Sequence, residues 1–328
     1  MRYFVTGATG FLGSRVTRLL RAGGHEVVAL VRDPGKAAAL AADGVTLALG
    51  DVTDPASLRT PMSGADGVFH MAGWYRLGLR DRTAGAAVNI EGTRNVLQAM
   101  RELGIAKGVY TSTLAVNSNT QGRLVDETYR FEGRHNSEYD RTKAGAHDVA
   151  LEFIREGLPL VILQPGIFYG AGGDVGPIHD FFVQFLRRQI PVVPRGTKFC
   201  WAHVDDVARG HLLAMERGRA GESYMLAGPV YELVEVLKLC EKFSGVRAPR
   251  MMAAPWMLKS MAAVMGVVER VVPVPANYTG EYLRENAGTS YIGDPSKARR
   301  ELGWEARPLE EGLPETMRHE MAALGMAA

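Results

Sequence analysis

Tyr139 and Lys143, four residues apart in the stretch YDRTK, have the types and spacing of an acid–base pair. On a helix, positions i and i+4 lie on one face, so the phenol and the ammonium would stand side by side. A phenol has a pKa of about 10, and a neighbouring ammonium stabilises the phenolate and lowers that pKa, which makes a usable proton relay. The same spacing also arises by chance on solvated helices, so the rest of the chain must decide between the two interpretations.

Three glycines near the N-terminus predict a dinucleotide site. The string TGATGFLG (6–13) follows the apolar run YFV (3–5) and opens a helix-like stretch. In this context Gly7 permits a tight turn, Gly10 lets the backbone approach a pyrophosphate, and Gly13 allows close contact between helix and strand. Amides at the helix N-terminus would donate to the phosphates. A glycine turn without a ligand is the alternative interpretation.

Two basic residues after the second predicted strand favour NADP over NAD. That strand ends near Val31, where dinucleotide-binding folds place the residue that contacts the adenosine ribose. An acidic residue there would bind a free 2′-hydroxyl, whereas Arg32, with Lys36 close behind, offers charged donors to a 2′-phosphate. Asp33 is interpreted as a cap of the following helix. The alternative is that Arg32 is an ordinary surface residue.

Short apolar runs alternate with longer helix-like stretches, as in parallel strands joined by crossover helices. The runs include 27–31, 45–49, 68–71, 109–111 and 160–163. We therefore predict an α/β fold, a Rossmann-type doubly wound parallel sheet with a smaller C-terminal substrate-binding lobe. The predicted dinucleotide-binding domain covers 1–170, with 201–228 returning to it, while 171–200 and 229–328 mainly form the lobe.

The composition argues against several other classes of protein. The formal net charge is +2 and the basic residues are scattered, so there is no electrostatic footprint for nucleic acid or an anionic membrane. Cys200 and Cys240 are the only cysteines, which indicates neither a disulfide framework nor a zinc site and favours a reducing cytoplasm. The N-terminus lacks the apolar run of a signal peptide. The Met-rich region 255–275 is too interrupted to span a bilayer and is expected to serve the core, a subunit contact or the substrate pocket.

Nine motifs follow one another along the chain. They are TGATGFLG (6–13), GDV (50–52), VFHMAG (68–73), VNIEGTRNVL (88–97), VYTSTLAV (109–116), YDRTK (139–143), QPGIFYG (164–170), HVDDVA (203–208) and KARRELGW (297–304). In this order they resemble the extended short-chain dehydrogenase/reductase family, the NAD-dependent epimerase/dehydratases. VRDP (31–34) and WYRL (74–77) are similar to its dihydroflavonol-4-reductase-like branch.

The resemblance implies a role for each residue of the predicted site. Tyr139 would be the proton donor, Lys143 would also bind the nicotinamide ribose, and Thr113 would orient the carbonyl oxygen, with Ser112 as the fallback if the register differs by one. Asn89 matches a further cofactor-contacting position, or is a helix cap. The implied cofactor contacts are Gly7, Thr9, Gly10, Phe11, Leu12, Gly13, Arg32, Lys36, Asp51, Val52, Met71, Ala72, Gly73, Tyr139, Lys143, Pro165 and Ile167.

The expected reaction follows from residues that the family's sugar enzymes carry and this chain lacks. Sugar-nucleotide epimerases place an arginine where Phe199 stands and an Arg-x-Gly-Asp string near 286–291, and dehydratases place acidic groups where Leu114 and Ala115 stand. We therefore expect NADPH-dependent reduction of a ketone or aldehyde, with a sugar epimerase using transient oxidation or a non-catalytic NADP-binding sensor as alternatives. The expected substrate contacts are Trp74, Tyr75, Thr113, Tyr139, Phe168 and Tyr169, with Leu77 and Phe181 as further apolar lining.

Two further expectations concern assembly and metals. The resemblance implies a homodimer in which the helices corresponding to 83–103 and 138–156 form a four-helix bundle. His70 and His203 are interpreted as structural histidines. The HVDD string therefore predicts no metal site.

Overall fold

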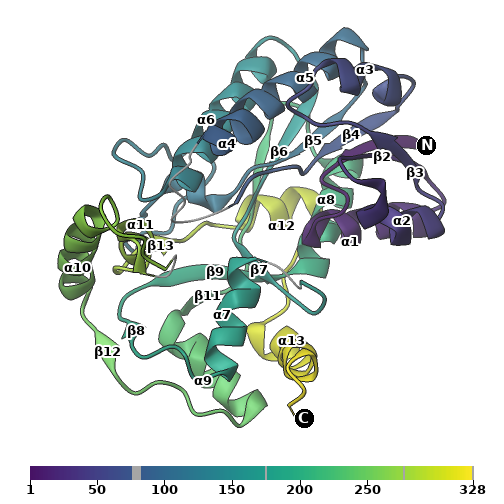
Figure 1. Ribbon diagram of the computed structural model, residues 1–328. Helices are drawn as coiled ribbons and strands as arrows, with labels where there is room; N and C mark the ends of the chain where they lie inside the picture. The colour runs from purple at the N-terminus through teal and green to yellow at the C-terminus, as the bar shows by residue number, and fades with distance from the viewer. Residues whose placement is uncertain (76–82, 174–175, 276–277, 327–328) are drawn as a thin grey trace.

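The centre of the protein is a parallel sheet of seven strands in the order β10-β6-β5-β4-β1-β2-β3 (Figure 1). The computed structural model describes residues 1–75, 83–173, 176–275 and 278–326. The strands are β1 (Arg2–Thr6), β2 (Glu26–Val31), β3 (Thr46–Leu49), β4 (Gly67–His70), β5 (Gly108–Thr111), β6 (Leu160–Pro165) and β10 (Ser223–Leu226). The predicted α/β class with a doubly wound parallel sheet is confirmed.

Helices cover both faces of the large sheet (Figure 1). One face carries α1 (Phe11–Ala22), α2 (Ala38–Ala42) and α8 (Val204–Arg217), and the other carries α3 (Ala56–Met62), α5 (Gly92–Glu102) and α6 (Glu138–Arg155). Alternate residues of β1 show the two layers, because Val5 packs with the first set and Phe4 with the second. A sheet covered on both faces needs apolar residues on both sides of each strand, which explains the continuous apolar runs of the sequence.

A smaller lobe is built around a second sheet, in which β9 is paired with β7, β11 and β13. Its elements are β7 (Ile167–Tyr169), α7 (Pro177–Leu186), β8 (Val193–Pro194), β9 (Lys198–His203), β11 (Val230–Glu232), α9 (Leu233–Ser244), β12 (Met252–Ala253), α10 (Pro255–Val268), α11 (Gly280–Glu285), β13 (Ser290–Tyr291) and α13 (Leu309–Ala323). Apolar side chains of α7, α9 and α13 pack together around Trp201 of β9. The chain returns from β9 to the large domain at α8.

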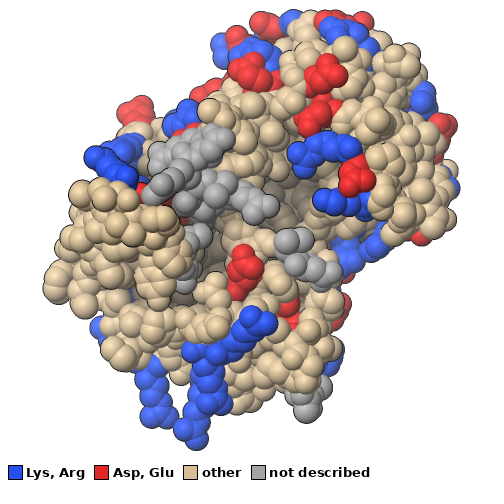
Figure 2. Space-filling view, in the orientation of Figure 1, with Lys and Arg blue, Asp and Glu red and all other residues tan. Residues whose placement is uncertain are grey.

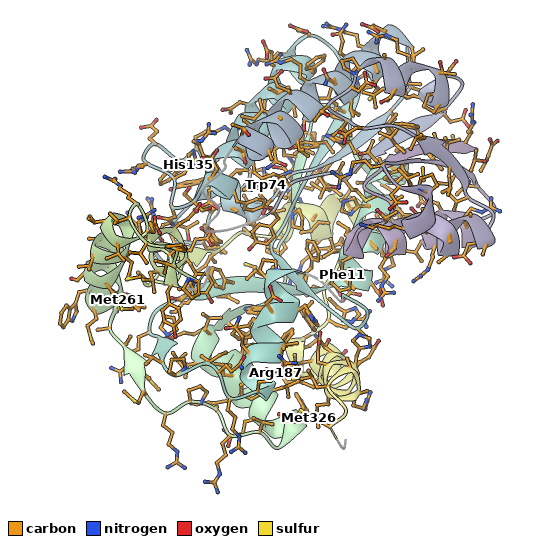
Figure 3. The ribbon with its side chains drawn as sticks, viewed as in Figure 1. Phe11, Trp74, His135, Arg187, Met261 and Met326 are labelled. Carbon is orange, nitrogen blue, oxygen red and sulfur yellow. The ribbon has the colours of Figure 1, made fainter. Side chains whose placement is uncertain are left out.

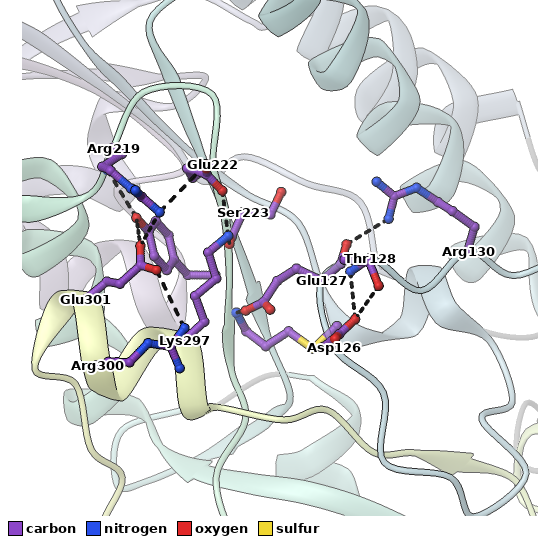
Figure 4. A network of polar contacts seen from close by, with 12 residues as sticks. Asp126, Glu127, Thr128, Arg130, Arg219, Glu222, Ser223, Lys297, Arg300 and Glu301 are labelled. Atoms are coloured by element: carbon purple, nitrogen blue, oxygen red, sulfur yellow. Dashed lines mark hydrogen bonds and ion pairs between the residues drawn. The ribbon is translucent and has the colours of Figure 1, made fainter.

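The KARRELGW motif fastens the C-terminal region to the edge of the large sheet. It forms α12 (Ser296–Leu302), which packs on α8 and on the edge strand β10. Lys297 donates to the Glu222 carboxylate at 2.6 Å and to the Ser223 carbonyl at 2.9 Å (Figure 4). Glu301 accepts from the Tyr224 hydroxyl at 3.0 Å. These contacts give the motif a structural function.

The HVDD motif starts α8 and ties it to the residues before α13. The His203 side chain accepts from the Asp205 amide at 3.3 Å, so it caps the helix. The Asp206 carboxylate accepts from both the Nε and Nη2 atoms of Arg307, at 2.9 and 2.8 Å, and its carbonyl accepts from the Trp304 indole at 2.7 Å. Among the described residues there is no cluster of histidine, cysteine or carboxylate side chains that could hold a metal ion.

Candidate active site

The glycine turn between β1 and α1 leaves its backbone open where a phosphate group would lie. Gly7 has a φ of +77°, and a Cβ there would lie 2.7 Å from the Ala72 amide nitrogen. A Cβ on Gly13 would lie 2.0 Å from the Gly7 carbonyl oxygen, so the helix contacts the turn directly. Gly10 is less crowded, since its Cβ would meet only that same oxygen at 3.2 Å. Gly10 also brings no side chain to cap the α1 amides, and this arrangement fits the pyrophosphate of a dinucleotide.

Basic side chains follow β2 at the same edge of the sheet. Arg32 is highly exposed, with 78% of its side chain accessible, and its Nε lies 4.0 Å from a carboxylate oxygen of Asp51. Lys36 is exposed on the short helical turn 34–37 that follows. Asp33 accepts from the Gly35 amide at 2.9 Å and so caps this turn, as the sequence suggested. Arg32 and Lys36 are therefore accessible to a phosphate beside the adenosine ribose. The side chain of Val52, another predicted cofactor contact, is buried.

Tyr139, Lys143 and Thr113 come together where β5 ends against the first turns of α6. The Lys143 ammonium donates to the Thr111 carbonyl at 2.8 Å and to the Tyr110 hydroxyl at 3.2 Å. Thr113 forms a hydrogen bond with the Tyr139 phenol and also accepts from the Ala115 amide at 3.2 Å. The three side chains predicted from the sequence thus share one site, held by a strand end and a helix start.

Ser112, the fallback for Thr113, is used elsewhere. Its hydroxyl lies 2.9 Å from Nδ1 of His147, and both side chains are buried. Burial lowers the pKa of His147 to about 3, so the imidazole is neutral and the contact is structural. The geometry therefore favours Thr113 as the hydroxyl beside Tyr139.

The acidity of Tyr139 differs from the sequence-based expectation. Burial raises the pKa of the Tyr139 phenol, the hydrogen bond with Thr113 opposes this rise, and the charges of Asp140 and Glu285 add to it. Burial also lowers the pKa of Lys143 to about 7. The expected lowering of the Tyr139 pKa is therefore not seen, because desolvation by burial raises that pKa. A phenol of this kind stays protonated at neutral pH and is suited to donate a proton.

Asn89 connects Trp74, in the segment after β4, to α6 through hydrogen bonds. Its side-chain oxygen accepts from the Trp74 amide at 2.7 Å, and its side-chain nitrogen donates to the Trp74 carbonyl at 3.0 Å and to the Thr142 hydroxyl at 2.9 Å. Asn89 lies in a π-helical turn, Ala86–Glu91, which is a frequent feature of functional sites. It is not a helix cap, and its contacts hold Trp74 next to the helix that carries the Tyr–Lys pair.

Some of the predicted substrate contacts border the site, and one is buried in the core of the lobe. The Tyr75 and Tyr139 rings lie 4.3 Å apart, and the Phe168 and Phe11 rings 6.1 Å apart, so Tyr75 and Phe168 border the site. Phe11 and Trp74 both lie on the side of the large domain that faces the lobe (Figure 3), where the surface is hollowed (Figure 2). Tyr169 is only 1% exposed and packs in the lobe core, so its prediction as a substrate contact is not supported. Leu77 lies outside the described residues.

The other predicted cofactor residues lie along the carboxyl ends of the strands. Parallel strands end at one edge, which places Met71, Ala72 and Gly73 after β4 next to the glycine turn. The Ala72 amide donates to the Thr6 hydroxyl at 3.2 Å, and this bond fixes the start of that segment. Pro165 is buried at the end of β6, and Ile167 packs against the lobe core.

A buried acidic cluster beside the tyrosine is a feature that the sequence reasoning missed. Asp140 accepts from the Tyr291 hydroxyl at 2.8 Å and from the Ser137 hydroxyl at 2.9 Å, and it shares a hydrogen bond with Glu285 of α11. Burial raises the pKa of Asp140 to about 7 and raises the pKa of Glu285 well above its usual value. The residue that follows the predicted acid is thus itself a proton-holding group.

Comparison with known proteins identifies this combination of fold and site. A model of the "NAD dependent epimerase/dehydratase family" matches residues 3–227. The chain belongs to this family. It is 31% identical over 323 residues to a putative dihydroflavonol 4-reductase from Synechocystis sp., with 96% of this chain and 93% of the relative covered. It is 32% identical over 312 residues to sterol demethylase protein B from Methylococcus capsulatus, with 92% and 93% covered.

The fold comparison agrees with the family assignment. The crystal structure of gox2253 superposes with a TM-score of 0.85 at 31% identity and covers 99% of each chain. The resemblance to extended short-chain dehydrogenase/reductases and to their dihydroflavonol-reductase-like members is therefore confirmed. The family consists of nicotinamide-dependent oxidoreductases and epimerase/dehydratases, so this chain is an enzyme of that kind.

Proposed function

We propose that this protein is an NADPH-dependent reductase that converts a ketone or aldehyde with apolar surroundings into an alcohol. The observation that carries the proposal is the hydrogen bond between Thr113 and Tyr139, next to Lys143 and on the sheet edge that holds the glycine turn. Two hydroxyls at this place are able to bind one carbonyl oxygen together. The nicotinamide cofactor, when bound, supplies the hydride.

Each residue of the site then has a defined task. Thr113 donates to the substrate oxygen and fixes its position, and Tyr139 donates the proton that turns the developing alkoxide into a hydroxyl. The raised pKa of the Tyr139 phenol keeps this proton in place until the charge develops. Lys143, when protonated, would offer an ammonium donor to the ribose of the bound cofactor. Its burial against Tyr110 holds the ammonium in one position.

The residue at position 199 favours an apolar substrate over a sugar nucleotide. Phe199, which stands where the family's sugar enzymes carry an arginine, stacks on Tyr291 with ring centroids 5.5 Å apart. The names of two relatives also refer to molecules with large apolar surfaces, a dihydroflavonol and a sterol. These features support the reductase over the epimerase alternative.

The decisive experiment replaces Tyr139 with phenylalanine. Tyr139→Phe keeps the ring and removes the acid, so turnover with an apolar carbonyl substrate should fall by roughly 10²–10⁴ while NADPH binding persists. Tyr231→Phe is the matched control, because its hydroxyl contacts Glu310 in the lobe. A reductase consumes one NADPH per product molecule, whereas an epimerase causes no net change in cofactor absorbance. Wild-type turnover by Tyr139→Phe, or interconversion without NADPH consumption, would contradict the proposal.

The preference for NADP is a separate part of the proposal. The exposed guanidinium of Arg32 supports it, and Arg32→Ala should weaken NADP binding by roughly 1–3 kcal/mol with little effect on NAD. Arg59→Ala, which removes an arginine paired with Glu102, serves as the control. Calorimetric titration showing equal loss for both cofactors would count against the assignment. The homodimer through α5 and α6 stays a prediction that sedimentation can test.

A further inference from the structure

Helix α10 is apolar on both its inner and its outer side. Its inner side, with Leu258 and Ala262, packs on Leu283 and Ala287 of the α11 region. The contact is close, since a Cβ on Gly280 would lie 2.7 Å from the Ala262 carbonyl oxygen. The helix PWMLKSMAAVMGVV has only two polar side chains, Lys259 and Ser260. A helix that is apolar all round normally lies in a core or in a membrane.

The outer side of α10 is exposed to solvent over a continuous area. Its exposed apolar residues form what we call the α10 face, and their accessible fractions range from 37% for Val268 to 70% for Trp256. The face consists of Trp256, Met257, Met261, Val264, Val267 and Val268. Met251 (69% exposed) precedes it and Val271 (80%) follows it. A contiguous apolar patch on a folded chain indicates an interaction surface, unlike single exposed residues.

Figure 2 shows this patch as an uncharged area of the surface over α10, and Met261 marks it in Figure 3. The segment that carries it has three exposed basic residues: Lys259 within α10, Arg250 before it and Arg270 after it. Residues 250–272 contain one acidic residue, Glu269, and its carboxylate accepts from the Gly280 amide at 2.9 Å. The segment that carries the α10 face is therefore locally basic, which corrects the expectation, drawn from the scattered basic residues and the net charge of +2, that the chain has no electrostatic footprint for an anionic membrane.

We propose that the α10 face docks the protein onto the surface of an anionic phospholipid bilayer. Apolar side chains would enter the boundary between headgroups and acyl chains, with the helix in the plane of the membrane and Trp256 at the interface. The basic residues of the segment then meet the anionic headgroups. None of the helices in the described ranges has the length and hydropathy of a membrane span.

The charge of the segment 250–272 favours a bilayer over a second copy of the chain. A twofold contact brings the same patch of both copies together. The segment of each copy carries three basic residues against one carboxylate, Glu269, so such a contact would bring an excess of positive charge together. An anionic surface offers the opposite charge to all three at once.

α10 is connected to the candidate active site through α11. α10 packs on α11, and Glu281 of α11 accepts from the Glu138 amide, one residue before Tyr139. Docking would therefore bring the site next to the bilayer. If the proposed function holds, the apolar substrates of the enzyme include carbonyl compounds dissolved in that bilayer. The docking itself does not depend on the reaction.

The test is co-sedimentation of the full chain with lipid vesicles, without substrate or cofactor. Vesicles of phosphatidylcholine with roughly one third phosphatidylglycerol should bind the protein, and pure phosphatidylcholine should bind it less. A double variant, Val264→Glu with Val267→Glu, should lose binding by at least about tenfold, since it puts two carboxylates into the apolar face. Lys259→Ala should weaken binding by about fivefold, and only to the anionic vesicles.

A single Val264→Glu change should also weaken binding, and its matched control is Leu124→Glu, which places the same charge on an equally exposed apolar residue elsewhere: Leu124 is 62% exposed and Val264 61%. Leu124→Glu should bind like the wild type, and thermal melting should show that all variants are folded. No binding of the wild type to anionic vesicles, or equal loss with Leu124→Glu, overturns the proposal. Reversible dimers in sedimentation velocity that Val264→Glu dissociates would also overturn it, since the face would then be a subunit contact. Because turnover is not measured, these outcomes are distinct from failure of the proposed reaction.

Discussion

Replacing Lys143 with methionine should make the protein more stable at neutral pH while removing its activity. Lys143 is 5% exposed, and burial lowers its pKa to about 7 from the ordinary 10.5. The ammonium has two partners, the Thr111 carbonyl and the Tyr110 hydroxyl, and they replace only part of its hydration. The folded chain therefore holds this proton less tightly than the unfolded chain does, so the charge destabilises the fold.

The size and the pH dependence of the effect follow from that shift. The pKa falls from 10.5 to about 7, and at 1.36 kcal/mol per unit this corresponds to on the order of 3–5 kcal/mol. Because the folded pKa is the lower one, the penalty is fully present below about pH 7 and fades as the pH rises toward about 10.5. The stability gain of Lys143→Met should thus be largest near pH 6 and shrink toward pH 10.

Urea denaturation at a series of pH values, in the absence of cofactor, measures this difference. The quantity of interest is the gap in the free energy of unfolding between variant and wild type, and how this gap changes with pH. Any packing effect of methionine that does not depend on pH cancels in that change. Lys242→Met, at an exposed position of α9, reports the effect of removing a surface lysine. A gap that stays constant from pH 6 to 10, or that widens as the pH rises, would refute the reasoning.

Two further predictions use neighbouring residues as controls. Thr113→Val should lower turnover by roughly 10–10³, because the hydroxyl beside the phenol is lost, whereas Ser112→Ala should keep most of the activity. Equal effects of the two changes in steady-state assays would contradict the choice of Thr113 as the hydroxyl beside Tyr139. Asp206→Asn should cost about 1–3 kcal/mol in urea denaturation at pH 7, because Arg307 loses a carboxylate whose pKa is lowered by that pairing despite burial. This stability is present above about pH 4 and lost as the pH falls below it, while Asp205→Asn, at a half-exposed pair, should cost little.

The large domain was predictable because its signals are local. Apolar runs of strand length, separated by amphipathic stretches, require a parallel sheet covered on both faces. The glycine spacing at 6–13 was likewise sufficient to predict the turn between β1 and α1. Gly7 has a positive φ there, and Gly13 makes a close contact with Gly7 within the same turn. Tyr139 and Lys143 share a face because α6 is helical there, which the i, i+4 spacing already implied.

The contacts that the sequence did not predict join residues far apart in the chain. Asp140 meets Tyr291 across 151 positions, and Asn89 meets Thr142 across 53. Tyr169 is the last residue of β7, in a motif that was expected to point to the site, yet it is buried because α13 packs over it from the C-terminal end. Such outcomes depend on how the lobe packs, and neither periodicity nor spacing carries that information.

The lobe also influences the acid strength of the catalytic candidate. Tyr139, Lys143 and Thr113 all belong to the large domain, but the charges that raise the pKa of the Tyr139 phenol include Glu285 of α11. The same helix holds the start of α6 through the bond from the Glu138 amide to Glu281, and Glu285 shares a hydrogen bond with Asp140. A movement of α11 would therefore change both the position of Tyr139 and the field on its proton. Because α10 is packed on α11, the outer face of the lobe and the proton of the site are linked through two helices.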